Sequence, residues 1–316
     1  MPNARWSGLF PATAMPFREN FDIDEPEFRK LLTWLMGVRG VTGIVVNSHA
    51  GEIAHTTPSE RHRINEITVD HIAGKSLVVS GISAEGTREA AEMAHDAKKA
   101  GVDGLLVMPP HRWLRKGKSL EETLGFFQAI ADAADLPMII HQYPAATKAS
   151  YDAEALVALS KIPQVVAVKN GTREFARYER QVFELRQKAP HISILTCHDE
   201  YILASTMCGV DGAILGFATF VPELISDMME AAKRNDWVTA KKLNEQLYYL
   251  KLATYGSDEP PMYAHAYLKE AMVQIGRLKH ARVRPPVPPL TDAEREKIRK
   301  LLEKAGMLQD AARRAA

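Results

Sequence analysis

The amino-acid sequence of 316 residues predicts an α/β fold, a TIM (β/α)8 barrel with a C-terminal helical extension. Three observations favour this fold class. Eight short apolar runs alternate with helical patterns, the runs are apolar throughout instead of at every second residue, and one glycine turn occurs three times between a helix and a strand. We therefore expect residues 1–222 to form the barrel and residues 223–316 to form an extension of the same unit.

The eight apolar runs are expected to be the barrel strands, because they are nearly continuous in Val, Ile, Leu and Ala. That composition is typical of strands buried on both faces, as in a parallel sheet. An open doubly wound sheet is the alternative, but no glycine-rich phosphate loop follows the first strand. The expected strands are Gly8–Thr13, Gly43–Ser48, Leu77–Ile82, Gly104–Pro109, Met138–Gln142, Val165–Lys169, Ile192–Thr196 and Gly212–Gly216.

Capping boxes mark three helix starts. In such a box a Ser or Thr caps the helix, and a Glu three residues later accepts from the amide of the capping residue. The boxes lie at Thr57–Glu60, Ser119–Glu122 and Thr291–Glu294. From Glu85 to Ala100 small apolar residues share one face, which predicts an amphipathic helix.

The C-terminal part of the chain contains helical patterns without further strands. After Pro222 we expect helices over residues 223–251 and 263–275. A proline-rich connector, 284–289, then precedes the last capped helix. The tail, residues 311–316, is expected to be frayed, because it has no apolar pattern that could join a core.

The turn motif Gly-Val-x-Gly begins at Gly40, Gly101 and Gly209, each time between a helix and the next strand. The first glycine suits a left-handed helix C-cap, after which the short loop enters the strand. Three copies of one turn indicate a single repeating architecture, although the length alone would suit two domains.

The composition excludes several classes of protein. The 40 Lys and Arg residues balance 39 Asp and Glu, which argues against a protein that coats nucleic acid or anionic lipid but is compatible with a single anion-binding pocket. The two cysteines, Cys197 and Cys208, cannot build a disulfide framework and lack zinc spacing. No signal-peptide core or membrane-length apolar run is present. We expect a cytoplasmic protein with no nucleic-acid or membrane partner.

The catalytic groups of such barrels come from the C-terminal ends of the strands. Lys169 closes one apolar run and should point into the barrel or its mouth. An ammonium group held there loses hydration, which favours the free amine that can attack a carbonyl. Alternatively, Lys169 caps its strand and pairs with Asp199 or Glu52, and the spacing alone favours neither interpretation.

Four histidines also lie at or just past strand ends: His49, His111, His141 and His198. Imidazoles there could ligate a metal, move protons or bind an anion, and with 11 histidines in the chain they could also be ordinary loop residues. A metal-dependent barrel hydrolase usually carries an early His-x-His, whereas the first strand ends Phe10-Pro11-Ala12-Thr13. We therefore expect no metal.

Four segments, Gly8–Ala12, Ser48–Glu52, Val166–Asn170 and Arg284–Thr291, carry a family resemblance in the same order along the chain. They resemble the opening, the Gly-Thr-Thr-Gly-Glu loop, the Schiff-base strand and the ending of the pyruvate-type lyases that include dihydrodipicolinate synthase and N-acetylneuraminate lyase. The chain is identified as a divergent member of this family. The resemblance implies a catalytic lysine at Lys169, no cofactor apart from the lysine-bound substrate, and a homotetramer built as a dimer of dimers.

Several family positions are occupied differently in this sequence. The family's hydroxyl pair, which helps to bind the keto-acid carboxylate, falls on His49 and Ala50. Its proton-relay tyrosine falls on His141, a second tyrosine that reaches across a subunit interface falls on His111, and the arginine of true dihydrodipicolinate synthases falls on Ala146. Tyr143 shares the strand face of His141 if the extended geometry continues, and it could supply the missing phenol.

The resemblance and the strand-end residues together imply a lyase that acts on pyruvate or a related 2-keto acid through an iminium and enamine on Lys169. It would be an aldolase or a dehydratase or hydratase-aldolase. His141, with His111 or Tyr143, would move protons. The expected substrate-binding residues are Ser48, His49, Ala50, Gly51 and Gly216.

Three other functions remain open at this point. The first is a dihydrodipicolinate synthase-type condensation of pyruvate with an aldehyde. The second is a metal-dependent barrel hydrolase that uses the histidines, and the third is a non-catalytic relative that binds a keto acid.

Overall fold

The computed structural model of the chain describes residues 6–255 and 264–308. All eight predicted strands are present, and β2 ends at Val46 because Asn47 turns the chain with a φ of +49°. The strands are β1 (Gly8–Pro11), β2 (Gly43–Val46), β3 (Leu77–Ile82), β4 (Gly104–Val107), β5 (Met138–Gln142), β6 (Val165–Asn170), β7 (Ser193–Thr196) and β8 (Gly212–Leu215).

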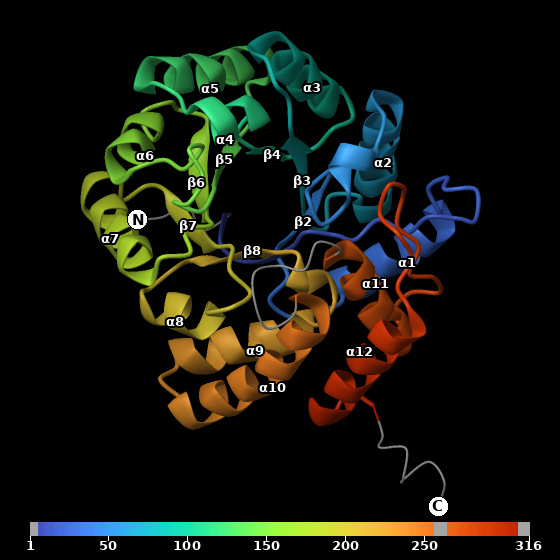
Figure 1. The fold of residues 1–316 in the computed structure, drawn as a ribbon. Helices are drawn as coiled ribbons and strands as arrows, with labels where there is room; N and C mark the ends of the chain where they lie inside the picture. Colours follow the sequence, from blue (N-terminus) through green and yellow to red (C-terminus); the bar gives the residue numbers. More distant parts are fainter. Residues whose placement is uncertain (1–5, 256–263, 309–316) are drawn as a thin grey trace, which may run out of the picture.

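The strands are parallel and lie in the order β1-β8-β7-β6-β5-β4-β3-β2, curled into a barrel with helices around it (Figure 1). Between β1 and β2 the ring closes through single bridges, Leu9 to Val41 and Ala12 to Val45. The amide of Thr13 also donates to the carbonyl oxygen of Val45 over 2.9 Å. The predicted (β/α)8 barrel is confirmed.

The helices lie outside the ring, and 3-10 turns follow β2 and β8. The helices are α1 (Glu25–Met36), α2 (Pro58–Ile72), α3 (Thr87–Lys99), α4 (His111–Lys116), α5 (Leu120–Ala134), α6 (Ala153–Leu159), α7 (Phe175–Lys188), α8 (Ile202–Met207), α9 (Pro222–Lys233), α10 (Trp237–Tyr255), α11 (Ala264–Gln274) and α12 (Asp292–Lys304); the 3-10 turns are η2 (Ile53–His55) and η3 (Phe217–Thr219). Within the described ranges, no helix combines the length and the apolar character needed to cross a lipid bilayer.

Two apolar cores explain the continuous apolar runs. One core lies between the strands and the helices, and the other fills the barrel interior with side chains from alternate strand positions. Both faces of each strand are therefore buried, as the composition of the runs predicts. The interior core consists of Trp6, Phe10, Ala12, Val45, Leu77, Val79, Leu106, Ile139, Ala167, Leu195 and Ile214.

The repeated glycine turn has the predicted conformation. Gly40, Gly101 and Gly209 have φ values of +90°, +87° and +79°. These values lie in the left-handed region, where an L side chain is strained and glycine is not. The same turn therefore returns the chain from a helix to the barrel three times.

Two of the three predicted capping boxes are complete, at Thr57 and Thr291. The third prediction is half wrong. Ser119 Oγ accepts from the amide of Glu122 over 3.0 Å, but the Glu122 carboxylate accepts from Trp113 Nε1 over 2.9 Å instead of from the Ser119 amide. A tertiary hydrogen bond to α4 has displaced the local one.

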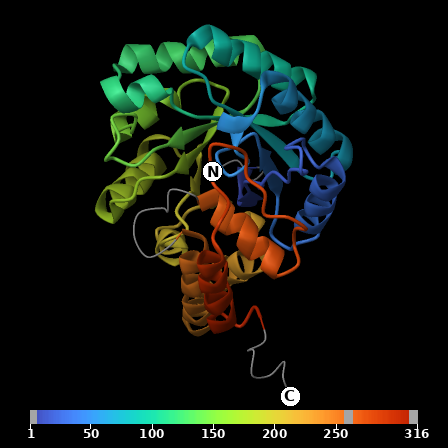
Figure 2. The ribbon, with the colours of Figure 1, turned by 45° about the vertical axis from the view of Figure 1, so that its right-hand side comes forward.

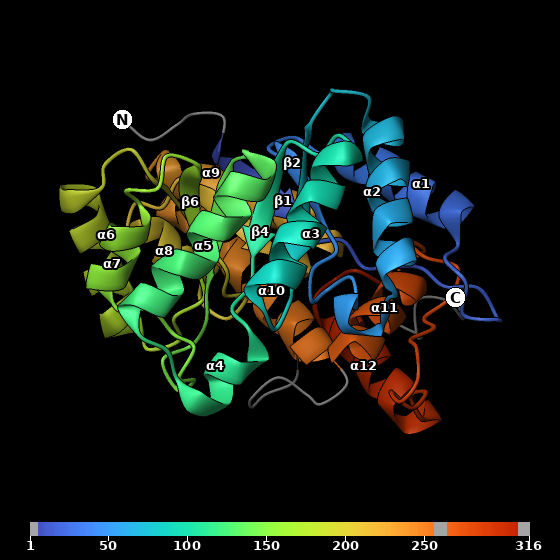
Figure 3. The same ribbon diagram turned by 90° about the horizontal axis from the view of Figure 1, so that it is seen from above.

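The C-terminal extension packs against one side of the barrel (Figure 2). The single helix predicted over residues 223–251 is wrong, because α9 and α10 are separate helices. Asn235 ends α9 with a φ of +61°, and Asp236 begins the next helix by accepting from the Thr239 amide over 3.1 Å. The start of the helix predicted at residue 263 and the tail 311–316 lie outside the described residues. Seen from above, α4, α11 and α12 lie toward the same end of the barrel (Figure 3).

Candidate active site

Four residues form one further layer of the barrel interior, at the C-terminal ends of the strands. They are His141, Lys169, Cys197 and Gly216, each two residues after an interior residue of β5, β6, β7 or β8. Because side chains two apart on a strand share a face, these residues point into the barrel mouth. His141 and Lys169 are also direct neighbours in the register of β5 and β6.

Two adjoining cavities open at this end of the barrel. The inner cavity, about 310 Å³, contains Lys169 together with Ser48, His49, Ala50 and Gly216. The outer cavity, about 420 Å³, extends past Tyr143 and has His111 at its edge. The side chains that line both are His49, His141, Arg173, Cys197, Asp199 and Tyr255. A cavity of about 470 Å³ on the outer side of α11 is lined by none of the strand-end residues.

Lys169 lies at the bottom of the inner cavity and is 7% exposed. Its ammonium group contacts the Cys197 thiol through a hydrogen bond. Among residues 6–255 and 264–308, no carboxylate lies within 4.0 Å of it. Glu52 pairs with Lys269 instead, and Asp199 hydrogen-bonds the Tyr255 hydroxyl. Neither ion pair of the alternative interpretation forms, so Lys169 faces a cavity where a carbonyl compound can reach it.

His49, His141 and Tyr143 form an aromatic group above the lysine. The ring centroids of His141 and Tyr143 are 4.9 Å apart, and those of His49 and His141 are 5.7 Å apart. Tyr143 therefore does face the same side as His141, and its hydroxyl hydrogen-bonds His49 Nε2.

The electrostatic surroundings keep this group uncharged. Burial, with Lys169 second, lowers the pKa of His49 to about 3 and that of His141 well below its usual value. Burial also raises the pKa of Tyr143 above its usual range. At neutral pH the three side chains are therefore neutral.

The other two strand-end histidines do not join this group. His111 is the exposed first residue of α4, where its Nδ1 lies 3.1 Å from Glu85 Oε1. The Nδ1 of His198 lies 3.1 Å from Glu200 Oε2, and its ring stacks on Tyr201 at 4.9 Å. In the part of the chain that the structure describes, no group of three or more His, Cys, Asp or Glu side chains could hold a metal ion.

The loop after β2 supplies polar groups to the inner cavity. Ser48 is buried, and its hydroxyl has no hydrogen-bond partner among the described residues. The amide of Gly51 donates to the Ser48 carbonyl over 3.1 Å and that of Glu52 to the His49 carbonyl over 2.9 Å. Gly51 is not among the residues that line the inner cavity, whereas Ser48, His49 and Ala50 are, so the polar groups of these three residues are the candidates for an anion site.

Gly216 closes the other side of the inner cavity. A Cβ at this position would lie 3.1 Å from the Cβ of Ala50 and 3.2 Å from the Tyr255 hydroxyl. The backbone φ of −64° is ordinary, so the glycine is required for space and not for conformation. It lets β8, the loop after β2 and α10 approach one another.

Asp199 and Tyr255 are site residues that the sequence reasoning did not assign. Burial, followed by the neighbouring Glu200, raises the pKa of the Asp199 carboxyl to about 8. One of its oxygens has no hydrogen-bond partner among the described residues. A carboxyl that is mostly protonated near pH 7 can donate a proton to a departing oxygen or to a carbonyl oxygen that is under attack.

Comparison with known proteins gives consistent results. Residues 5–305 match the model of the dihydrodipicolinate synthetase family. The chain is 31% identical to the 4-hydroxy-tetrahydrodipicolinate synthase of Neisseria gonorrhoeae over 302 residues, which are 95% of this chain and 99% of the relative. It is also 31% identical to the enzyme of that name from Nitratidesulfovibrio vulgaris over 307 residues, 96% and 100% of the two chains.

Two solved structures illustrate the similarity in fold. One is YagE, a prophage protein of the dihydrodipicolinic acid synthase family from E. coli K12 in complex with pyruvate, with a TM-score of 0.87 and 24% identity over 96% of this chain and 99% of that one. The other is the chloride-inhibited dihydrodipicolinate synthase of Acinetobacter baumannii complexed with pyruvate, with a TM-score of 0.84 and 25% identity over 96% and 99%.

Proposed function

The chain belongs to the dihydrodipicolinate synthetase family, and from that premise we propose that it is a lyase whose Lys169 forms a Schiff base with pyruvate or a related 2-keto acid. The observation that carries the proposal is the position of Lys169, which is buried at a cavity, hydrogen-bonded to a thiol and without a carboxylate partner among the described residues. A lysine held only for stability would have an ion-pair partner at this depth.

The Lys169 amine adds to the C2 carbonyl, and loss of the former carbonyl oxygen as water gives an iminium. The iminium draws electrons from the bond between C3 and its substituent. As the hydroxyl group on the departing carbon loses its proton, that bond breaks, the substituent leaves as an aldehyde, and C3 keeps the electron pair as part of an enamine. Protonation of C3 and addition of water at C2 then release the keto-acid product and regenerate the amine. The reverse direction joins the enamine to an aldehyde.

Each step requires a proton to move near Lys169. We assign this to His141, the neighbour of Lys169 in the strand register, and to the hydrogen-bonded pair of His49 and Tyr143. In the condensation direction Asp199, on the shared wall of both cavities, is placed to protonate the aldehyde oxygen. The Ser48 hydroxyl and the amides of His49 and Ala50 would hold the carboxylate.

The second candidate is a dihydrodipicolinate synthase-type condensation of pyruvate with an aldehyde, the kind of activity for which the relatives are named. It is favoured by 31% identity over essentially the full length of those enzymes. The presence of His141, His111 and Ala146 at the positions of the family's two tyrosines and its arginine instead favours a different substrate for this chain.

We further propose that the protein is a cytoplasmic homotetramer, a dimer of dimers, that needs no cofactor. Family membership supports this assembly, and His111 is exposed at the rim of the outer cavity, where a neighbouring subunit could adjoin it. Light scattering after size-exclusion chromatography tests it directly. A mass of four chains is expected, and a monomer at micromolar concentration would contradict it.

Reductive trapping tests the proposed chemistry. The protein is incubated with sodium borohydride and, in turn, with pyruvate and a panel of longer 2-keto acids, and its intact mass is measured. One reduced adduct per chain, located by peptide mapping on Lys169 and absent from Lys169→Met, is expected. The absence of any adduct, or an adduct on another lysine, would overturn the proposal.

A further inference from the structure

Helix α11 belongs to the C-terminal extension, yet two of its side chains reach the loop that follows β2. The ring of His265 hydrogen-bonds the backbone of His49. One turn further along, Lys269 Nζ donates to the carboxylate of Glu52. Residues four apart lie on one helical face, so one face of α11 contacts both ends of the segment from His49 to Glu52.

The contact between Lys269 and Glu52 is an ion pair within the core. The Lys269 side chain is 1% exposed and that of Glu52 is fully buried. Lys269 Nζ also donates to the carbonyl oxygen of Arg282 over 2.6 Å and lies 4.5 Å from the centre of the Phe17 ring. Burial of two charges is costly even when they are paired, so such a pair is poor evidence of stabilisation and better explained by the geometry it imposes.

Glu52 needs this fixation because its backbone is left-handed, with a φ of +55°. Its second carboxylate oxygen accepts from the amide of Arg284 over 3.2 Å. The guanidinium group of Arg284 is in turn paired with Glu60, at the start of α2. Both carboxylate oxygens of Glu52 are therefore held by residues of the C-terminal extension, while its backbone precedes the 3-10 turn η2.

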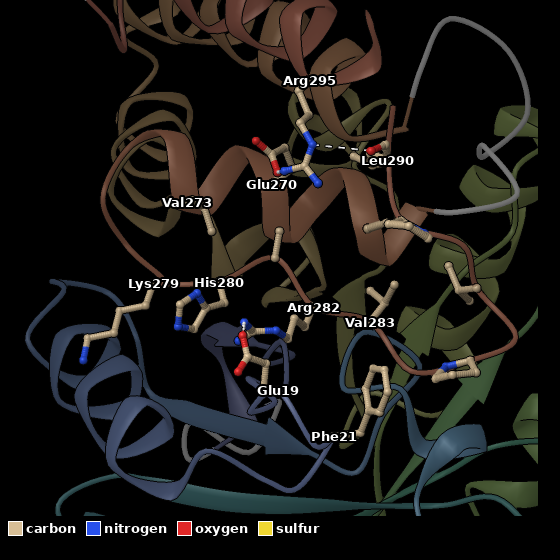
Figure 4. Close-up of a pocket in the computed structure, with 15 residues that line it drawn as sticks. Glu19, Phe21, Glu270, Val273, Lys279, His280, Arg282, Val283, Leu290 and Arg295 are labelled. Atoms are coloured by element: carbon tan, nitrogen blue, oxygen red, sulfur yellow. Dashed lines mark hydrogen bonds and ion pairs between the residues drawn. The ribbon is translucent and has the colours of Figure 1, made fainter. Parts of the chain in front are cut away.

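The C-terminal segment is itself anchored on the outer side of α11 (Figure 4). Arg282 pairs with Glu19 at 3.0 Å, and Arg295 pairs with Glu270 at 2.7 Å. Phe21 and Val283 are grouped on one side of the cavity drawn there. The Arg282 carbonyl oxygen, which accepts from Lys269, thus belongs to a segment that is held both to the barrel and to the last helix.

We propose that His265 and Lys269 are positioning residues for keto-acid binding. They hold the segment His49–Glu52 so that the Ser48 hydroxyl and the amides of His49 and Ala50 face the carboxylate of the substrate; this rests on the function proposed above for that loop. Neither residue takes part in bond making at Lys169. The C-terminal extension is therefore part of the substrate site, and loss of either contact weakens keto-acid binding more than it slows the chemical step.

The test measures the rate of borohydride trapping of pyruvate against pyruvate concentration. For Lys269→Met we expect the half-saturating concentration to rise about tenfold or more, because a hydrogen bond to a charged group is lost, with the limiting rate changed less than about threefold. His265→Phe keeps an aromatic ring and leaves no charge without its partner. For this variant we expect the half-saturating concentration to rise about three- to tenfold. Lys241→Met, on the exposed surface of α10, is the matched control and should behave as the wild type.

Hydrogen exchange of the amides of residues 48–55 provides a second measurement that needs no ligand. Faster exchange of this segment in Lys269→Met and His265→Phe, but not in Lys241→Met, is expected. Unchanged half-saturation and unchanged exchange in the folded variants would overturn the inference, as would a fall in limiting rate alone.

The outcomes separate this inference from the proposed function. If Lys269→Met does not fold, His265→Phe decides, because it removes only a neutral contact. If the wild-type protein traps no keto acid, the proposed function fails, and the exchange measurement still decides whether α11 holds the loop. If the wild type is trapped on Lys169 and both variants match it, only the positioning role is wrong.

Discussion

The buried carboxyl of Asp199 makes the stability of the fold depend on pH in a direction that its surroundings determine. Burial, followed by Glu200, raises its pKa from 3.8 to about 8 against the opposing hydrogen bond from Tyr255. Between about pH 4 and pH 8 the folded state therefore binds more protons at Asp199 than the unfolded chain does. Asp199 therefore does not destabilise the fold at a pH below its unfolded pKa, where the carboxyl is protonated in both states. As the pH rises toward 8, ionisation lowers the free energy of unfolding progressively.

The substitution Asp199→Asn isolates this effect, because the amide keeps the shape and an acceptor for the Tyr255 hydroxyl but cannot ionise. One pKa unit corresponds to about 1.4 kcal/mol. For each pH unit, the free energy of unfolding of the variant should therefore rise by up to that amount relative to the wild type. Between pH 5 and pH 8 the relative gain could reach about 4 kcal/mol, and it should be constant above pH 9.

Urea denaturation at four pH values between 5 and 9.5, followed by fluorescence, measures the two free energies of unfolding. Asp132→Asn, an exposed aspartate on α5, is the control, and no comparable slope is expected for it. The reasoning would be refuted if the free energies of unfolding of the wild type and Asp199→Asn changed in parallel with pH. It would also be refuted if the wild type became more stable relative to the variant as the pH rose. Either result would mean that Asp199 is ionised in the folded protein.

Three further outcomes follow from the geometry. Gly216→Ala adds a methyl group where the cavity walls are already close, so KM for the keto acid should rise about tenfold in steady-state kinetics, and an unchanged KM would show that the walls yield freely. Tyr143→Phe removes the partner of His49, so kcat should fall about a hundredfold with little change in KM; an unaffected kcat would remove Tyr143 from proton transfer. Gly209→Ala, at a φ of +79°, should destabilise by about 1 kcal/mol, while Gly125→Ala within α5 should stabilise by about as much. In urea denaturation, a stable Gly209→Ala would contradict the first assignment and a destabilised Gly125→Ala the second.

The barrel was predictable because its signals are local. Continuous apolar runs require burial on both faces, and the glycine at the start of each repeated turn has the positive φ that only glycine adopts without strain. The break at Asn235 was missed because the helical pattern continues across it, and only the tertiary position of α9 requires the chain to turn there. The incomplete box at Ser119 has a similar cause, since a distant indole competes for Glu122.

The candidate site was predictable as far as the strand ends supply it. Lys169, His141 and Tyr143 follow the two-residue period of β5 and β6, and the same period would have identified Cys197 two residues after Leu195. Tyr255 could not be found this way, because it comes from the end of a helix well beyond the last strand.

The histidines show the opposite limit of sequence reasoning. All four line the outer cavity, but only His49 and His141 belong to the group above the lysine. His111 is drawn outward by Glu85, and His198 is held by Glu200 and Tyr201 away from the group above the lysine.

The most direct test of the account is a crystal structure of the protein soaked with pyruvate. We expect a covalent bond between Lys169 Nζ and C2 of pyruvate, with the carboxylate against Ser48, His49 and Ala50. Pyruvate bound without a covalent bond, or bound away from the inner cavity, would contradict the central claim that Lys169 is the Schiff-base residue.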